Sequence, residues 1–334
     1  YNNHYYLLIL ICLIMLLLPA SNYASLDVKN NPEIKQNTMP RWCSFVMIFQ
    51  VAIVYFFATL AKFYPGWLDG SFTKLILSNT EFEVFKKLFT QHWFHLFIAY
   101  SGIAFDMLII PLLLWKRTRT IAFLSAVFFH LFNAIFLQIG IFPFFALSFI
   151  VFFYPPEKIR SIFFRKKIPA EYAPPIAQNK AALLYFFLPF FIIQLILPIR
   201  HHFIKGDVLW TEEGHRLSWR MMLRQRQGYA TFRVIDKKSQ TEIPYDYLKK
   251  LNQKQQAFVA SNPDGIWQMA QIIKKEFAQK GTDVSVFVNA EASINGGKYN
   301  KLVNPETDMA TAKWDYFFHN DWILLYDAQG NILK

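Results

Sequence analysis

Long apolar runs dominate the first 200 residues of the chain. Six of them approach the roughly 20 residues that a helix needs to cross about 30 Å of hydrocarbon. They predict membrane helices over Tyr5–Pro19, Trp42–Tyr64, Trp93–Trp115, Thr120–Gln138, Gly140–Tyr154 and Ala181–Leu197. The first and the fifth are short, so they need tilt or a thinner bilayer to span it. We therefore expect a transmembrane helical domain over residues 1–199.

The pattern changes after residue 199. Tyr229–Ile235 alternates apolar and polar positions and leads into a turn at Asp236–Ser239, which predicts a hairpin. Asn252–Lys280 has helical periodicity, and Val284–Val288 and Trp322–Tyr326 are typical of strands. The predicted fold class is an all-α membrane bundle of about six helices, followed by a small α+β extramembrane domain over residues 200–334.

Composition and charge support the same class. The chain is 54% hydrophobic and has 36 Phe, more than a soluble domain of 334 residues needs. Its formal charge of +12 resides mostly in loops between the apolar runs, so we expect a lipid bilayer and no nucleic acid as partner. Loops 20–41, 116–119 and 155–180 carry twelve Lys and Arg, against three in loop 65–92. The positive-inside rule makes the first three cytoplasmic and the C-terminal domain extracytoplasmic, either periplasmic or lumenal.

The chain begins with Tyr1, from which we expect a fragment that lacks upstream spans. Cys12 and Cys43 are the two cysteines and are expected to be buried, unpaired thiols. Neither a phosphate-binding glycine loop nor His and Cys at metal-ligand spacing is present, so we expect no metal.

Lys62 is the first candidate for chemistry. It follows the apolar stretch 51–61 and precedes Phe63 and Tyr64. An ionisable group at such a depth is costly, so it either serves a function or extends its amine to the interface. Burial favours the uncharged amine, which can act as a general base toward a phenol-like hydroxyl.

Further polar candidates lie in or beside other runs. Asn3 and His4 precede the first run, where they can either hydrogen-bond a ligand or cap the helix. His130 and Asn133 lie one turn apart in the fourth run, which favours hydrogen bonds to a neighbouring helix or a ligand. Asp106, inside the third run, needs a buried partner that the sequence does not identify.

Trp219, Met221 and Met222 follow the last run, and Arg224 and Arg226 follow them. The Trp and Met side chains could wall an apolar ligand, while the Arg side chains could hold an anion. Ordinary packing beneath the extramembrane domain is the alternative.

In order along the chain, these segments resemble the vitamin K-dependent gamma-carboxylase family, with an HTTM-type membrane domain. The resemblance covers nearly the whole chain and is carried by Asn2-Asn3-His4, Tyr55–Lys62, Trp67–Gly70, Phe129-His130 with Asn133, Ile139–Phe142, Pro155–Glu157, Leu197-Pro198 with His202, Trp210-Thr211, Ser218–Met222, Ser293–Asn295, Asn304-Pro305 with Asp308, and Trp314. The chain departs from animal members at Ala61, where they carry a second Lys, and at Arg224, where they carry His. Its C-terminal region is also shorter.

The resemblance implies an enzyme that forms a carbon–carbon bond. Lys62 would deprotonate vitamin K hydroquinone, O2 would convert the quinol to its epoxide, and the resulting alkoxide would drive carboxylation of a peptide Glu by CO2. Asn3 and His4 carry over as catalytic hydrogen-bonding partners of the quinol, and a Glu-containing exported peptide carries over as partner. No metal is implied. The residues that we predict to bind the quinol are Met221, Met222, Trp219, Arg224, Arg226, His130 and Asn133.

Two other functions stay open. A lipid-quinol epoxidase would keep the oxygen chemistry and lack the Glu acceptor, and the departures at Ala61 and Arg224 leave room for it. A non-catalytic membrane scaffold that binds lipid would reuse the fold and turn over no quinol.

Overall fold

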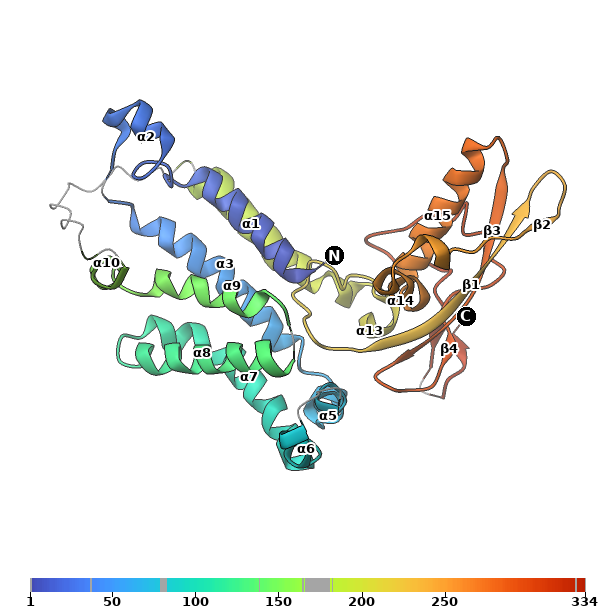
Figure 1. Ribbon diagram of the computed structural model, residues 1–334, viewed down its shortest axis with the longest axis horizontal. Helices are drawn as coiled ribbons and strands as arrows, with labels where there is room; N and C mark the ends of the chain where they lie inside the picture. The colour runs from blue at the N-terminus through green and yellow to red at the C-terminus, as the bar shows by residue number, and fades with distance from the viewer. Residues whose placement is uncertain are drawn as a thin grey trace. The chain divides into compact units, whose positions relative to one another are not determined.

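The computed structural model describes residues 2–36, 38–78, 83–137, 139–163, 165, 181, 183–327 and 329–333 (Figure 1). The chain divides into two compact units. The first, called here the membrane unit, consists of Tyr1–Leu197 and Trp219–Met221. The second, called here the C-terminal unit, consists of Pro198–Ser218 and Met222–Lys334.

The membrane unit is built from apolar helices, as predicted. Four helices within the described ranges are long and apolar enough to cross a membrane: α3 (Arg41–Leu60), α7 (His92–Leu114), α8 (Arg119–Phe136) and the continuous helix Leu183–Phe203, which comprises η4 (Leu183–Phe187), α12 (Leu188–Ile196) and η5 (Leu197–Phe203). The two runs predicted to be short form the shorter helices α1 (Asn3–Leu17) and Phe142–Phe153, which joins α9 (Phe142–Ser148) to η3 (Phe149–Phe153).

Short elements connect these helices: α2 (Leu26–Asn30), η1 (Pro32–Ile34), α4 (Pro65–Leu68), α5 (Ser71–Ser78), η2 (Glu83–Phe85), α6 (Lys86–Phe89) and α10 (Pro156–Phe163). Most of the basic loop 155–180, including Lys166, Lys167 and Lys180, lies outside the described residues, as do Gln138 and Ala182 at the ends of two predicted runs.

The helices of the membrane unit pack around one apolar cluster, and they also expose large apolar side chains on their outer faces. Leu16, Phe128 and Tyr185 are among the exposed ones. A soluble protein does not carry such extended apolar surface, whereas a bilayer solvates it. The exposed apolar faces therefore agree with a membrane location.

The C-terminal unit has a four-stranded antiparallel sheet with strand order β2-β1-β3-β4. Its strands are β1 (Arg226–Asp236), β2 (Glu242–Ile243), β3 (Val284–Ile294) and β4 (Asn300–Lys301), and β1 pairs with β3 from Arg226↔Ile294 to Asp236↔Val284. Alternate positions of β3 are buried, starting at Val284, because successive side chains of a strand point to opposite faces.

Helices cover this sheet, which confirms the predicted α+β class. α14 (Gln253–Ser261) packs on β1, and α15 (Pro263–Gln279) packs on β3 (Figure 1). The smaller elements are α13 (Val208–Thr211), η6 (Leu248–Lys250) and a two-stranded sheet of β5 (Leu325–Tyr326) and β6 (Ile332–Leu333). The predicted hairpin is formed by β1 and β2.

The single helical run predicted over Asn252–Lys280 is wrong in one respect, because it is two helices. Asn262 between them is extended, with φ −122° and ψ 128°, and Pro263 opens α15. A residue before proline is driven out of the helical region by the proline ring, so the chain turns at this point.

At Gly228 the backbone of β1 lies close to that of α14, and we predict that Gly228→Ala destabilises the C-terminal unit. A Cβ built there would lie 2.5 Å from the carbonyl oxygen of Ala260 and 2.7 Å from that of Glu291. Because backbone cannot move aside cheaply, we expect a loss of about 1–3 kcal/mol, measured by thermal unfolding of the full chain in detergent. Thr231→Ala, at an exposed position on the same strand, is the control and should leave the unfolding temperature within a degree or two. Equal unfolding temperatures for both variants would contradict the close approach.

Candidate functional site

Lys62 lies two residues after the end of α3, inside the membrane unit, with 8% of its surface exposed. Its Nζ lies 2.5 Å from Oδ2 of Asp106 on α7 and donates to the carbonyl oxygen of Ala58 at 3.1 Å. Asp106 is equally buried, at 7% exposure. The two side chains thus form a buried ion pair that joins α3 to α7, and Asp106 is the partner of Lys62.

Gly102 and Trp67 complete the surroundings of this pair. Nζ of Lys62 lies 5.4 Å from the centre of the Trp67 ring, which is fixed by a hydrogen bond from its Nε1 to the carbonyl oxygen of Ala99 at 2.9 Å. Gly102 is one turn before Asp106, and a Cβ there would meet Trp67 at 3.4 Å and Lys62 at 3.8 Å. The indole of Trp67 and the Cε atom of Lys62 therefore both lie next to Gly102 on α7.

A second polar contact lies on the same face of α3. Tyr55 precedes Lys62 by two turns, which corresponds to about 10 Å along the helix axis. Its hydroxyl lies 3.0 Å from Nε2 of His130 on α8. Phe105, next to Asp106, packs edge-on against the Tyr55 ring and stacks on Phe129. His130 therefore makes the interhelical hydrogen bond that its position favoured, and Asn133, one turn later, is half-buried.

The start of α1 carries the other two predicted catalytic residues. Asn2, and not Asn3 or His4, caps the helix, because its side chain accepts a hydrogen bond from the His4 amide. Nδ2 of Asn3 donates to the carbonyl oxygen of Arg220 at 3.3 Å. The His4 ring lies 6.3 Å from the ring of Phe142, which is itself 6.3 Å from that of His130. His4 is thus linked to the Tyr55–His130 contact through one aromatic side chain.

Trp219 is fully buried in the membrane unit. Its indole stacks on Tyr6 with ring centres 4.9 Å apart, and the Tyr6 hydroxyl donates to Oε1 of Gln194 at 2.9 Å. Met221 packs against the same apolar cluster, whereas Met222 is exposed and belongs to the C-terminal unit. The structure therefore brings Trp219 and Met221 together with α1.

The backbone around Trp219 is strained. Leu217, Trp219 and Met222 have φ values of 64°, 57° and 53°. Bulky residues rarely adopt this left-handed conformation, and each costs of order 1–3 kcal/mol unless the surroundings enforce it. Strain of this kind concentrates at functional sites.

Arg224 and Arg226 are held by Glu212. Arg224 forms a bidentate ion pair with both carboxylate oxygens of Glu212, and Nη1 of Arg226 donates to the carbonyl oxygens of Leu209 and Trp210 at 2.6 and 2.9 Å. Burial lowers the pKa of Arg226 to about 10, so it stays charged at neutral pH. These contacts fasten the start of β1 to α13.

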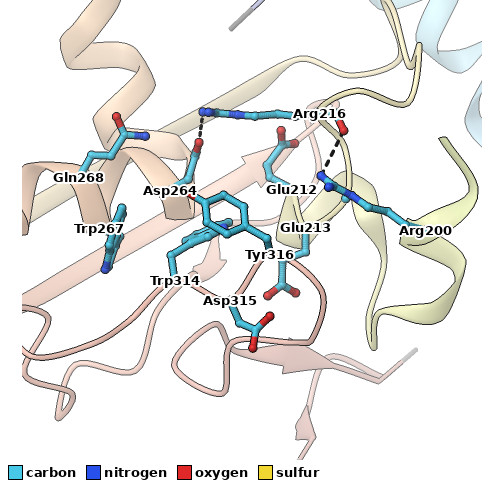
Figure 2. A pocket seen from close by; sticks show the side chains of 11 residues that line it. Arg200, Glu212, Glu213, Arg216, Asp264, Trp267, Gln268, Trp314, Asp315 and Tyr316 are labelled. Atoms are coloured by element: carbon cyan, nitrogen blue, oxygen red, sulfur yellow. Dashed lines mark hydrogen bonds and ion pairs between the residues drawn. The ribbon is translucent and has the colours of Figure 1, made fainter. Parts of the chain in front are cut away.

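A small pocket of about 50 Å³ lies in the C-terminal unit (Figure 2). It is lined by Arg200, Glu212, Glu213, Gly214, Arg216, Asp264, Trp267, Gln268, Trp314, Asp315 and Tyr316. Arg216 is ion-paired with Asp264, and Arg200 donates to the carbonyl oxygen of Arg216 at 3.2 Å. Within the described ranges, no group of three or more His, Cys, Asp or Glu is placed to hold a metal ion.

The predicted catalytic residues thus fall into two groups. Lys62 pairs with Asp106, and Asn3 and His4 lie with Arg220 and Phe142; among the described residues no direct contact joins Lys62 to Asn3 or His4. Sequence reasoning missed Tyr6, Gln50 and Gln194. The signal was present, because each is a polar side chain inside an apolar run.

Two family models match the chain. The HTTM domain model matches residues 1–157, and the model described as vitamin K-dependent gamma-carboxylase, lumenal domain, matches residues 179–329. No solved structure matches the chain.

The buried pair gives a stability prediction. Lys62→Met leaves the Asp106 carboxylate unpaired in an apolar interior, so we expect the protein to lose about 3–5 kcal/mol of stability. The double variant Lys62→Met with Asp106→Asn removes both charges, and most of that loss should disappear. Thermal unfolding in detergent measures both. Lys250→Met, at a solvent-exposed ion pair with Glu276, is the control and should have almost no effect. A double variant no more stable than Lys62→Met would contradict the pairing.

Proposed function

This chain belongs to the vitamin K-dependent gamma-carboxylase family as an HTTM-type membrane protein, and on that premise we propose that it uses vitamin K hydroquinone to carboxylate glutamate in exported peptides. The two family models follow each other along the chain in the order membrane domain, lumenal domain. The family gives the reaction class. The particular residues and steps below are our proposal.

The observation that carries the proposal is the Lys62–Asp106 pair. Buried ion pairs add little to stability compared with apolar side chains of the same volume, because both charges lose their hydration. Ionisable groups inside membrane proteins are therefore retained mainly where they act. A lysine and a carboxylate that share one proton, in a bundle whose interior is mostly apolar, are suited to exchanging a proton with a ligand.

The residues of the membrane unit fit a quinol. Trp219 and Met221 offer apolar walls, and Nδ1 of His130 and Nε1 of Trp219 are buried without a protein partner in the described part of the chain. Both atoms are suited to hydrogen-bond a quinol oxygen. When bound, vitamin K hydroquinone together with O2 supplies the oxidation that drives removal of the glutamate γ-proton before CO2 adds.

In this proposal Lys62 takes up the hydroquinone proton at Nζ. With the shared proton on Oδ2 of Asp106, the amine is neutral, and its lone pair can accept the quinol proton once the amine turns away from that hydroxyl. The hydrogen bond from Nζ to Ala58 orients the amine, and the quinolate anion left by the proton transfer balances the charge of the ammonium beside neutral Asp106. Asn3 and His4 hydrogen-bond the quinol oxygens, and the apolar helices keep water away. Arg224 and Arg226 shape the start of β1 through Glu212 in place of a direct role at the quinol.

The proposed topology places the site at the outer membrane boundary. By the distribution of Lys and Arg, residues 1–4, the Lys62–Trp67 segment and the C-terminal unit fall on the extracytoplasmic side. An exported peptide would therefore meet the quinol on the side where both are accessible.

We expect Lys62→Met with Asp106→Asn to abolish quinol epoxidation while the protein still folds. Loss of a general base lowers a rate by roughly 100-fold or more. The measurement is epoxide formation by purified protein in lipid nanodiscs, given vitamin K hydroquinone and O2. Lys250→Met is the matched control and should retain wild-type turnover. Should the folded double variant form epoxide at the wild-type rate, the pair is structural and the assignment of Lys62 is wrong.

Carboxylation distinguishes the proposed function from that of a quinol epoxidase, which has no Glu acceptor. We expect a Glu-containing peptide incubated with the enzyme, hydroquinone, O2 and bicarbonate to gain the mass of CO2 on Glu, because the γ-carbanion captures CO2. Mass spectrometry of the peptide detects the gain, and the same peptide with Gln in place of Glu is the control. If epoxide forms and the peptide gains no mass, the protein is a quinol oxygenase and the proposed carboxylase function is wrong.

A further inference from the structure

The loop Asp315–Asn320 of the C-terminal unit exposes three consecutive aromatic side chains. Tyr316, Phe317 and Phe318 are 61%, 67% and 71% exposed. Single exposed apolar residues are common, whereas three in a row on one loop mark a surface that another apolar phase covers.

Polar contacts hold this loop in shape. Oδ1 of Asp315 accepts hydrogen bonds from the amides of Phe317 and Phe318 at 2.8 and 2.9 Å. The amide of Asp315 donates to Oδ1 of Asn320 at 2.7 Å, which closes the loop at its base. The exposure of the aromatic side chains is therefore set by a defined turn.

The base of the loop is anchored on a buried carboxylate. The backbone and side-chain amides of Asn320 both donate to Oε1 of Glu213, at 2.7 and 2.8 Å. Nδ1 of His319 lies 2.7 Å from Oε2 of the same side chain, and Glu213 is almost fully buried. Glu213 is the second residue after α13, so the loop is fixed to a segment that lies 10 residues beyond Phe203, the end of the last apolar helix.

The loop also lies beside the end of that helix. Arg200 and Tyr316 line the same pocket of the C-terminal unit, as Figure 2 shows. Arg200 belongs to η5, the last part of the apolar helix Leu183–Phe203, where Arg200, His201 and His202 replace the apolar residues. A helix that spans a bilayer changes to polar residues at the lipid headgroups. Tyr316 thus lines the same pocket as Arg200, which belongs to the segment where this helix becomes polar.

We propose that Tyr316, Phe317 and Phe318 insert into the headgroup boundary of the bilayer and hold the C-terminal unit on the membrane surface. Aromatic side chains concentrate at this boundary, where their rings lie in a partly apolar layer and polar atoms reach water. Lys313, exposed just before the loop, is suited to lipid phosphates. The partner is a lipid surface, and the contact does not depend on the reaction proposed above.

The test places a fluorophore on the loop of the full chain. Cys12 and Cys43 are replaced by Ser and Ala, and Phe317→Cys is labelled with an environment-sensitive dye in nanodiscs that contain lipid with a nitroxide on its headgroup. We expect quenching at least threefold stronger than for Ser239→Cys, the control. Ser239 is exposed at the β1–β2 turn, at the opposite end of β1 from Arg226. Phe318→Cys is labelled as a second loop position.

Quenching at both loop positions no greater than at Ser239 would overturn the proposal. The fluorescence of a loop label could instead be unaffected by nitroxide lipid and change when a Glu-containing peptide is added. That result would identify a peptide-docking surface and would also overturn the proposal. Strong quenching at both loop positions in a protein that makes no epoxide would support the membrane contact while the proposed function fails.

Discussion

A membrane bundle offers no water to a charged side chain, and the candidate site depends on how this chain meets that constraint at Lys62. An amine that lies at the end of α3 with 8% exposure must be neutral or paired. The partner is Asp106 from α7, and Gly102, one turn earlier on the same helix, lies next to the Lys62 side chain. We expected from sequence an amine kept neutral by burial alone. In the structure the carboxylate of Asp106 contacts this amine, so any proton that Lys62 accepts is shared with Asp106.

Largely buried carboxylates that pair with residues from other segments also organise the C-terminal unit. Glu212 and Glu213 are consecutive, and the left-handed conformation of Glu212 separates the directions of their side chains. Glu212 takes the guanidinium groups of Arg224 and Arg226 and so fixes the start of β1. Glu213 takes His319 and Asn320 and so fixes the aromatic loop. Two neighbouring carboxylates thus set the positions of two segments that lie far apart in the sequence.

Local patterns predicted the elements of this fold, because they depend on residues close in the chain. The apolar runs, the hairpin after Ile235 and the helical period after Asn252 all needed only neighbouring residues, and the Asn262-Pro263 step could have predicted the break between α14 and α15. Contacts between side chains far apart in the sequence could not be predicted from such local patterns. Asp106 is 44 residues from Lys62, and Tyr55 is 75 residues from His130, so the sequence indicated costly polar groups and not their partners. Arg224 and Arg226 were predicted to hold an anionic ligand, whereas in the structure both pair with Glu212, which the sequence did not identify as their partner.

Trp219–Met221 links the part of the chain matched by one family model to the part matched by the other. The HTTM match ends at residue 157, whereas Trp219–Met221 lies within the lumenal match and yet belongs to the membrane unit. Full burial of an indole of about 200 Å² contributes roughly 5 kcal/mol, which exceeds the strain of about 1–3 kcal/mol at Trp219 itself. The burial on Tyr6 can therefore hold the unusual backbone, and with it the carbonyl of Arg220 against Asn3. A membrane domain cut at residue 157 would keep Lys62 and Asp106 and lose the indole and Met221 beside α1, so the complete candidate site requires both parts of the chain.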